Sequence, residues 1–163
     1  MAHMAKDIKV YNPDLTDIHP NAQIGKGTRI GVFTRIGANA LIGEDCVIGS
    51  HCNICEDTRI GKKVSIQTGV HVTRGVVIGD FSFIGPGVIT MNTKYMMHQR
   101  EEEELDAPKI GKWCRIGGGS CLLPGIRVND YALVGAGSVV TKDIPYGVKV
   151  YGNPAKIMGH TKK

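Results

Sequence analysis

Two histidines have the side-chain chemistry and the position to act on a substrate. His71 lies in a regular stretch of the chain, and His98 lies in a long segment that breaks the pattern of its surroundings. Because imidazole titrates near neutral pH, either ring could bind a substrate or take a proton from it. We expect His98 to be the proton acceptor, because its segment has no evident structural purpose. We expect no catalytic role for His19 or His51.

The five cysteines do not indicate a metal site. Cys52 and Cys55 have the spacing of half a zinc knuckle, but the chain has no second Cys or His pair that would complete four ligands. Cys46, Cys52 and Cys114 occupy a position that elsewhere in the pattern holds Ala, Thr, Ser or Val. We therefore expect them to be small buried residues, and we expect no bound metal.

The elements that would position these side chains follow a six-residue period. An aliphatic residue recurs at every sixth position for twelve hexads from Ile18 to Ile84, and the period resumes from Ile110 to Val140. A helix repeats every 3.6 residues and a plain strand every two, so neither produces this period. Hexads are typical of a β-helix, in which short strands wind into a solenoid. We predict an all-β fold, a parallel β-helix of about six coils stacked at roughly 4.8 Å.

The pattern also divides the chain. Residues 1–4 look like a cloning remnant, residues 5–17 an N-terminal cap, residues 18–153 the β-helix domain and residues 154–163 a short C-terminal tail that caps the other end. Glycine follows the aliphatic residue in most hexads. We expect the chain to turn a corner at these glycines with an unusual φ.

One segment does not fit the solenoid. Ile84 and Ile110 lie 26 positions apart, which is not a multiple of six, and the break covers residues 90–108. This excursion begins with apolar residues and ends with acidic ones. Loops of this length in compact domains are usually functional or disordered. We expect the excursion to project sideways and to lean on a neighbouring subunit.

Composition narrows the function classes. A chain of 163 residues fits one domain, and with 6% aromatic residues its core must be built from Ile and Val. The net charge of +5 suits an anionic ligand, but no basic stripe interleaved with aromatics indicates a nucleic-acid partner. No apolar run reaches membrane-spanning length and no secretory leader is evident, which indicates the cytoplasm.

The end of the pattern is the most specific motif. Residues 134–145 read VGAGSVVTKDIP and residues 152–156 read GNPAK, with glycine-rich turns upstream at residues 116–119 and 124–125. This sequence resembles the hexapeptide-repeat acyltransferases over nearly all of residues 18–158. The resemblance implies a left-handed parallel β-helix. It also implies a homotrimer whose active sites lie in clefts between two prisms.

The resemblance implies acetyl-CoA as the co-substrate. In such enzymes the pantetheine arm runs along the cleft against the backbone of the last coils, and Gly118 and Ala136 match two of these positions. Thr141 and Lys142 match a pair near the nucleotide, and Lys156 matches a basic residue after the Asn-Pro-Ala corner. Small residues let a slim ligand approach the backbone, and lysines supply charge for its phosphates.

The residues of the excursion indicate whether the acceptor is a hydroxyl or an amine. Maltose and galactoside O-acetyltransferases place a base histidine nine residues after a Gly-Pro corner. Counting from Pro86 puts Tyr95 at that position, with His98 three residues later. A hydroxyl is a weak nucleophile at neutral pH and needs such a base, so the mismatch argues against O-transfer.

The sequence is more similar to the bacterial N-acetyltransferases of nucleotide-linked amino sugars. These enzymes carry an asparagine six residues after the Gly-Pro corner, and Asn92 stands there. An amine held in line can attack a thioester without a dedicated base. The resemblance therefore implies that Asn92 orients the amine. His98 is expected as a proton acceptor because of its place in the excursion, and not because of the resemblance. His71, Arg74 and Tyr95 are expected to bind substrate, although Arg74 stands where these enzymes often have an acidic residue.

Three other functions are weighed against N-transfer. O-acetylation of a sugar or another small hydroxyl compound is the first alternative. A γ-class carbonic anhydrase needs two histidines on one coil with four residues between them. The spacings of 20 from His51 to His71 and 27 from His71 to His98 do not provide this pair. A non-enzymatic β-helix protein is disfavoured by Thr141, Lys142 and Lys156.

Overall fold

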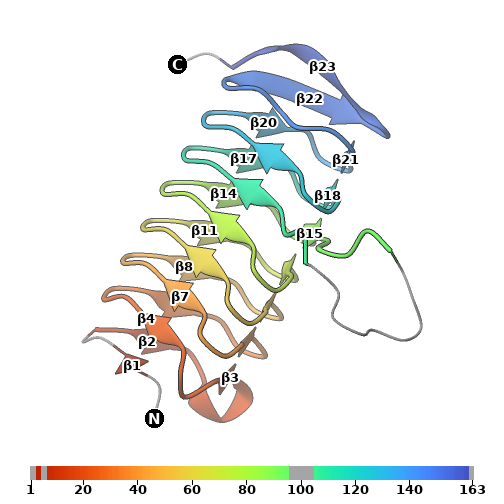
Figure 1. Ribbon diagram of the computed structural model, residues 1–163. Helices are drawn as coiled ribbons and strands as arrows, with labels where there is room; N and C mark the ends of the chain where they lie inside the picture. Colours follow the sequence, from red (N-terminus) through yellow and green to blue (C-terminus); the bar gives the residue numbers. More distant parts are fainter. Residues whose placement is uncertain (1–2, 5–6, 96–104, 162–163) are drawn as a thin grey trace.

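The chain folds into a three-sided solenoid of short parallel strands (Figure 1). The computed structural model describes residues 3–4, 7–95 and 105–161. Sheet A consists of β1 (His3–Met4), β4 (Gln23–Ile24), β7 (Leu41–Ile42), β10 (Arg59–Ile60), β13 (Val77–Ile78), β16 (Lys109–Ile110) and β19 (Arg127–Val128). Sheet B consists of β2 (Lys9–Val10), β5 (Arg29–Ile30), β8 (Val47–Ile48), β11 (Ser65–Ile66), β14 (Phe83–Ile84), β17 (Arg115–Ile116), β20 (Leu133–Val134), β22 (Val148–Gly152) and β23 (Ala155–His160). Sheet C consists of β3 (Asp17–Ile18), β6 (Arg35–Ile36), β9 (Asn53–Ile54), β12 (His71–Val72), β15 (Ile89–Thr90), β18 (Cys121–Leu122) and β21 (Val139–Val140).

Each coil contributes one strand to each sheet and is 18 residues long where the pattern is regular. The register shows this directly, because Arg35 pairs with Asn53 and Asn53 pairs with His71. The described part of the chain forms seven coils, one more than the hexads predict. The additional coil comes from β1, β2 and β3, which pair in parallel with β4, β5 and β6. Residues 9–18, expected mostly as a cap, therefore continue the solenoid, with the 3-10 helix η1 (Pro13–Leu15) inserted at one corner.

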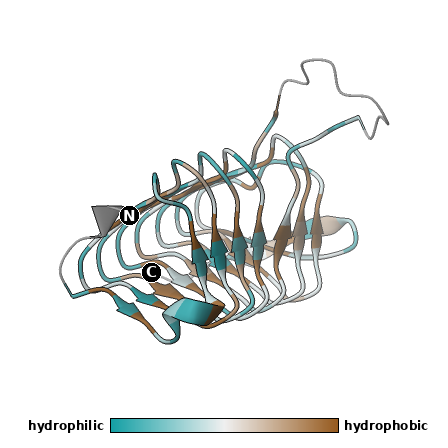
Figure 2. Cartoon of the chain, turned by 90° about the horizontal axis from the view of Figure 1, so that it is seen from below, coloured by the Kyte–Doolittle hydropathy of each residue, from teal (hydrophilic) through white to brown (hydrophobic). Residues whose placement is uncertain are grey.

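The two residues of a regular strand face opposite sides. In β5, β10 and β17 the first residue is exposed and the second is buried, as the alternation of side chains along a strand requires. Aliphatic residues therefore fill the prism interior, and burying each one contributes about 1.5–3 kcal/mol. Figure 2 shows the hydrophobic positions recurring in register along the stack of coils.

The predicted small buried cysteines are confirmed. Cys46, Cys52 and Cys114 are at most 2% exposed, and each thiol donates to a backbone carbonyl of the following coil at 3.1 or 3.2 Å. Burial raises the pKa of the Cys114 thiol to about 11. These thiols are packing elements, since a thiol that stays protonated is a poor nucleophile and metal ligand.

The expected role of the recurrent glycines was wrong in one respect. The positive φ values fall three positions after the aliphatic residue, at Asp45, Lys63 and Gly69 for example, and not at the glycine that follows it directly. That first glycine is needed because the coils stack closely. A Cβ on Gly117 would lie 2.4 Å from the backbone nitrogen of Ala136 in the next coil. Close approach, rather than an unusual φ, selects glycine there.

The excursion leaves the solenoid after β15, at the corner between sheets C and A, and the chain returns at β16 (Figures 1 and 2). Its two ends are joined. The amide of Asp106 donates to the carbonyl of Asn92 at 2.9 Å, and the ammonium of Lys94 lies 2.6 Å from the Asp106 carboxylate. Asp106 also accepts from the amide of Gly125 in the next coil at 2.6 Å. The insertion therefore leaves the stacking of coils intact.

A hairpin closes the C-terminal end of sheet B. β22 pairs in parallel with β20, and β23 runs antiparallel to β22. The antiparallel strand β23 ends the parallel stacking of sheet B. Among the described residues, no helix has the length and apolar character needed to cross a membrane.

Candidate functional site

Two corners of the prism flank the outer face of sheet C. We call the turns from sheet B to sheet C corner BC, and the turns from sheet C to sheet A corner CA. Gly118 and Ala136 lie on corner BC, before β18 and β21. Thr141 and Lys142 lie on corner CA, directly after β21, and both are exposed. The two groups belong to the same last coils but lie on opposite edges of sheet C.

Corner BC carries almost no side chains in its C-terminal half. Gly69, Gly87, Gly119 and Gly137 occupy one position in four successive coils, each with a φ between 66° and 72°. A Cβ added to Gly87, Gly119 or Gly137 would meet nothing within 4 Å, so the corner is open to solvent. The result is a bare track along the solenoid. A narrow chain such as a pantetheine arm could lie against the backbone there.

The outer face of sheet C changes character along the axis. Its outward positions are polar in the first four coils: Asp17, Arg35, Asn53 and His71. They are Ile89, Cys121 and Val139 in the last three coils, and Ile89 is 41% exposed. The apolar strip lies between the bare track and Lys142. A ligand that touched both corners of one chain would cross this strip.

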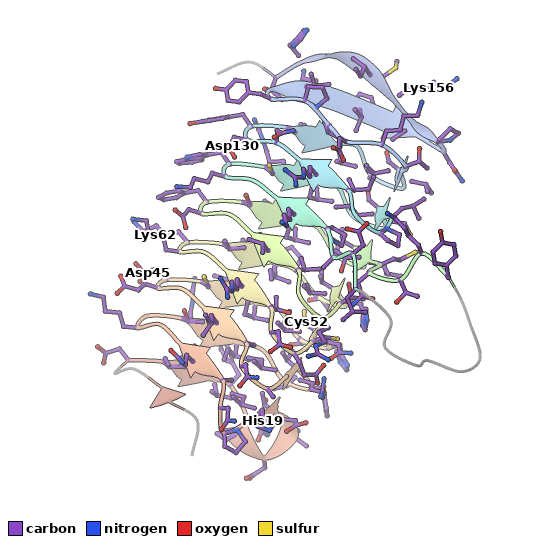
Figure 3. All side chains as sticks on the ribbon, in the orientation of Figure 1. His19, Asp45, Cys52, Lys62, Asp130 and Lys156 are labelled. Atoms are coloured by element: carbon purple, nitrogen blue, oxygen red, sulfur yellow. The ribbon has the colours of Figure 1, made fainter. Side chains whose placement is uncertain are left out.

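Lys156 lies on the C-terminal hairpin beside corner BC, because its pairing partner Tyr151 packs over Gly135. It lies on β23, which pairs with β22 in sheet B, and it is exposed near the C-terminal end of the solenoid (Figure 3). One chain therefore does not gather all five positions expected to bind the cofactor around one point. Gly118 and Ala136 face corner BC, Thr141 and Lys142 corner CA, and Lys156 the hairpin.

The residues expected at the acceptor are brought together. His71 lies on the outer face of β12, Arg74 follows it on corner CA, and Asn92 lies at the same corner one coil further on. The side-chain amide of Asn92 donates to the carbonyl of Arg74 at 3.0 Å. Tyr95 lies three residues after Asn92 in the excursion and is 72% exposed. His98 lies outside the described residues, and its role remains a prediction.

We call Arg35, Asn53, Glu56, Asp57, His71, Arg74 and Asn92 the polar patch. Ion pairs hold its two arginines in place. The Arg74 Nε donates to the Asp57 carboxylate at 2.7 Å, and Arg35 forms a hydrogen-bonded ion pair with Glu56. The hydrogen bond from Asn39, together with that from Arg74, lowers the pKa of Asp57. Arg35 likewise lowers the pKa of Glu56. Both carboxylates are therefore ionised at neutral pH. They also hold the two guanidinium groups, so that Arg74 approaches any ligand from a fixed position.

Sequence reasoning missed part of this patch. Asn53 lies between Arg35 and His71, with its side-chain nitrogen 3.2 Å from Nδ1 of His71. Arg35, Asn53 and His71 are spaced 18 residues apart, which is one full coil. Reading the sequence in coils, rather than in hexads, would have placed the three side chains in one column. No group of three His, Cys, Asp or Glu side chains arranged to hold a metal occurs among the described residues.

A groove of about 520 Å³ adjoins corner BC in the N-terminal coils. Its lining residues include Tyr11, Gly49, Ser50 and Thr68. Ser50 and Thr68 occupy the same turn position as Gly118 and Ala136 do in later coils. The groove therefore lies in line with the bare track.

Two family profiles match this chain. The profile described as "Bacterial transferase hexapeptide (six repeats)" matches residues 21–56 and 57–90. The profile described as "Hexapeptide repeat of succinyl-transferase" matches residues 109–142. Together they match well over half of the chain, and the residues between them are the excursion. The resemblance inferred from the sequence is confirmed.

Two curated relatives are acetyltransferases. Serine acetyltransferase 3, mitochondrial, from Arabidopsis thaliana is 35% identical over 97 residues, which make up 58% of this chain and 25% of the relative. The dTDP-3-amino-3,6-dideoxy-alpha-D-galactopyranose 3-N-acetyltransferase of Aneurinibacillus thermoaerophilus is 49% identical over 51 residues, 31% of this chain and 27% of the relative. The matched part of this chain thus spans about a quarter of the length of either relative.

Solved structures share the fold. The acetyltransferase domain of PglB from Neisseria gonorrhoeae FA1090, in complex with acetyl coenzyme A, superposes with a TM-score of 0.58 at 25% identity. The match covers 93% of this chain and 57% of that chain. The prediction of an all-β, left-handed parallel β-helix with hexapeptide repeats is confirmed.

Proposed function

Because the chain belongs to the hexapeptide-repeat family of bacterial transferases, we propose that it moves the acetyl group of acetyl-CoA to the amine of a nucleotide-linked amino sugar. Three similarities support the proposal. One relative is named as an N-acetyltransferase of such a sugar. The PglB domain is described with acetyl coenzyme A. The bare track on corner BC offers an exposed backbone against which the pantetheine arm could lie.

The observation that carries amine transfer is the orientation of Asn92. Its side-chain nitrogen donates to the carbonyl of Arg74, which can only accept, so the nitrogen and oxygen of the amide are distinguished. The amide oxygen accepts a long hydrogen bond of 3.4 Å from the hydroxyl of Thr93, and its second lone pair can receive a hydrogen bond from a ligand. An amine nitrogen can donate to that oxygen while its lone pair points at a thioester carbon. Asn92 would then act by holding the amine in line.

The reaction balances without a further reagent. The amine nitrogen forms a bond to the thioester carbonyl carbon, and the carbon–sulfur bond breaks. The sulfur leaves as a thiolate, and the proton released by the nitrogen ends on the thiol or in solvent. The products are an N-acetyl sugar and CoA. Positioning of two bound reactants can supply about 7–11 kcal/mol of the barrier reduction.

The distribution of cofactor residues supports a shared site. Gly118 and Ala136 lie on one corner, and Thr141 and Lys142 lie on the other. A CoA molecule that lies between two prisms could touch corner BC of one copy and corner CA of its neighbour. This proposal extends to a homotrimer in which each cleft between subunits holds one cofactor. Its mass in solution would be three times the 17.6 kDa of one chain.

Transfer to a hydroxyl is the second candidate. Serine acetyltransferase 3 matches this chain over 97 residues, a longer stretch than the amino-sugar relative matches. A hydroxyl acceptor needs a general base. His71 lies in the acceptor region, and His98 follows Tyr95 by three residues in the sequence. Serine and sugar hydroxyls are therefore included in the test.

The test is a measurement of thiol release from acetyl-CoA with a panel of acceptors. The panel contains nucleotide-linked amino sugars, the same sugars with a hydroxyl in place of the amine, free amino sugars, serine and maltose. We expect kcat/KM for one nucleotide-linked amino sugar to exceed that for its hydroxyl counterpart by at least about a thousandfold. Equal or faster thiol release with serine or a hydroxyl sugar would contradict amine transfer.

A further inference from the structure

A row of polar side chains runs along the N-terminal coils of sheet C and ends at His71. Glu56 binds the guanidinium of Arg35, and Arg35 Nη1 donates to Oδ1 of Asn53 at 3.4 Å. Asn53 Nδ2 then lies 3.2 Å from Nδ1 of His71. On the other side of His71, the paired residue is Ile89, which has no polar side-chain atom. The polar contact to the ring along this column therefore comes from Asn53.

The hydrogen-bonding groups of these side chains determine which atom donates and which accepts along the row. A guanidinium has only N–H donors, so the atom of Asn53 that faces Arg35 must be its oxygen. The Asn53 amide nitrogen, which can only donate, then faces Nδ1 of His71. Nδ1 must accept, so the neutral imidazole carries its proton on Nε2. Glu56 keeps its charge because Arg35 lowers its pKa, and the ion pair holds the guanidinium toward Asn53.

We infer that His71 serves the acceptor site as a hydrogen-bond donor through Nε2–H, and that Asn53 is the residue that fixes this tautomer. His71 would bind an oxygen atom of the sugar substrate, such as a hydroxyl or phosphate oxygen. It would not remove a proton from the substrate, because in this tautomer Nε2 has no free lone pair. The inference rests on the proposed function only for the identity of the ligand.

The location of the ring agrees with a binding role. His71 is half-buried on the outer face of β12, and Arg74 and Asn92 lie on the adjoining corner CA. A general base at His71 would need a partner that accepts a hydrogen bond from Nδ1–H, such as a carboxylate. Position 53 holds an amide instead. The Asn53→Asp variant would supply that carboxylate and should reverse the tautomer.

Nitrogen NMR of protein labelled with 15N-histidine tests the tautomer without any activity. His71→Gln identifies the His71 signals among the six histidines by their loss. We expect the wild-type ring to show a protonated Nε2 and an unprotonated Nδ1 at pH 8. In Asn53→Asp we expect the proton on Nδ1. Asn21→Asp, an exposed position in another coil, adds the same charge and should leave the His71 signals unchanged.

Kinetics then test the role of the donor. Gln at position 71 presents an amide N–H at a similar reach to Nε2–H, so His71→Gln should keep KM for the sugar within about threefold of wild type. His71→Leu and Asn53→Asp lose the donor, and KM should rise about tenfold with little change in kcat. A base role predicts instead that Gln and Leu both abolish turnover.

Each outcome has a separate meaning. A wild-type ring protonated on Nδ1 would overturn the tautomer inference, whatever the activity. An Nε2–H ring combined with equal loss of turnover in His71→Gln and His71→Leu would overturn the donor role. An Nε2–H ring in a protein that acetylates no amine would refute the proposed function, while the tautomer assignment would stand.

Discussion

The side-chain amide of Asn92 donates to the backbone carbonyl of Arg74 at 3.0 Å, across the corner where the excursion begins. This contact ties the start of the excursion to the preceding coil. It also distinguishes the nitrogen of the Asn92 amide, which donates, from the oxygen, which can accept. A residue predicted from a six-residue count after a Gly-Pro corner is therefore found in a fixed orientation.

Replacing Asn92 with Ala should lower kcat/KM for the amine acceptor by about 100-fold, because the amine is then no longer held in line with the thioester. The Kd for CoA should stay within about twofold, since Asn92 lies on a different corner from Gly118 and Ala136, and two coils before Thr141 and Lys142 on corner CA. Steady-state kinetics and calorimetry measure the two effects. Asn21→Ala serves as the control at an exposed position in another coil. A fall in CoA affinity equal to the fall in activity would refute the positioning role.

The bare track can be blocked without disturbing the fold. Ala136 is exposed on corner BC, so Leu at this position should change the free energy of unfolding by no more than about 0.5 kcal/mol. The larger side chain should weaken CoA binding by about tenfold or more, measured by calorimetric titration. Ala38→Leu makes the same change on corner CA of an N-terminal coil, and should bind CoA as the wild type does. Unchanged affinity in Ala136→Leu would remove CoA from corner BC.

The predicted proton acceptor His98 can be tested by its removal. If positioning supplies most of the rate, His98→Ala should keep most of the N-transfer activity and abolish any O-transfer. The thiol-release assay with one amine and one hydroxyl acceptor measures both. His19→Ala should change neither rate. A loss of several orders of magnitude on the amine would show that amine transfer also depends on a base.

The polar patch makes a contribution to stability that depends on pH. Arg35 holds the pKa of Glu56 below its ordinary value of 4.5, so the folded state binds fewer protons near that pH than the unfolded state does. The stabilisation is complete above pH 4.5 and is lost as the pH falls through the folded pKa. For a pair this exposed it should amount to about 0.2–1 kcal/mol.

Urea unfolding of the wild type and of Glu56→Gln at pH 7 and pH 3 checks this sign. The variant should be less stable than the wild type at pH 7, and the difference should shrink at pH 3. A difference that grows on acidification would contradict the depressed pKa. Glu44→Gln is a suitable control, because its ion pair with Lys26 is long, at 3.8 Å.

A stack of aromatic rings stabilises the corner between sheets A and B. Phe81 and Trp113 lie in successive coils with ring centroids 4.3 Å apart and planes 8° apart, although both residues have positive φ. A double-mutant cycle of Phe81→Ala and Trp113→Ala should give a coupling energy of about 0.5–1.5 kcal/mol. Trp113 is the single tryptophan, so its fluorescence reports on this corner directly. Additive effects of the two substitutions would show that the stack contributes nothing.

The solenoid could be predicted from the sequence because an aliphatic residue recurs every six positions and all of these residues must face the same interior. Residues 9–18 form a further coil that was not predicted from the sequence. The aliphatic residues Val10 and Ile18 are too few to show a period there, and η1 interrupts the spacing between them. The glycines were found correctly but for an incomplete reason. Stacking of one coil on the next, which no single hexad reveals, sets the need for glycine at Gly117.

The candidate site was only partly predictable. Asn92 and Arg74 could be placed by counting, because the corner before the excursion keeps the regular spacing. Asn53 could not be singled out, since an amide acquires a role only through the neighbours that fix its orientation. The separation of Gly118 and Ala136 from Thr141 and Lys142 likewise appears only when the coil is closed into a prism.

The proposed function requires that the acetyl group ends on nitrogen. Acetyl-CoA labelled with 13C at the acetyl carbonyl is incubated with the protein and a nucleotide-linked amino sugar, and the product is followed by 13C NMR. Amine transfer predicts a new amide carbonyl signal coupled to a 15N-labelled sugar amine, formed at the rate of thiol release. An ester carbonyl signal, or thiol release without any acetylated nitrogen, would contradict it.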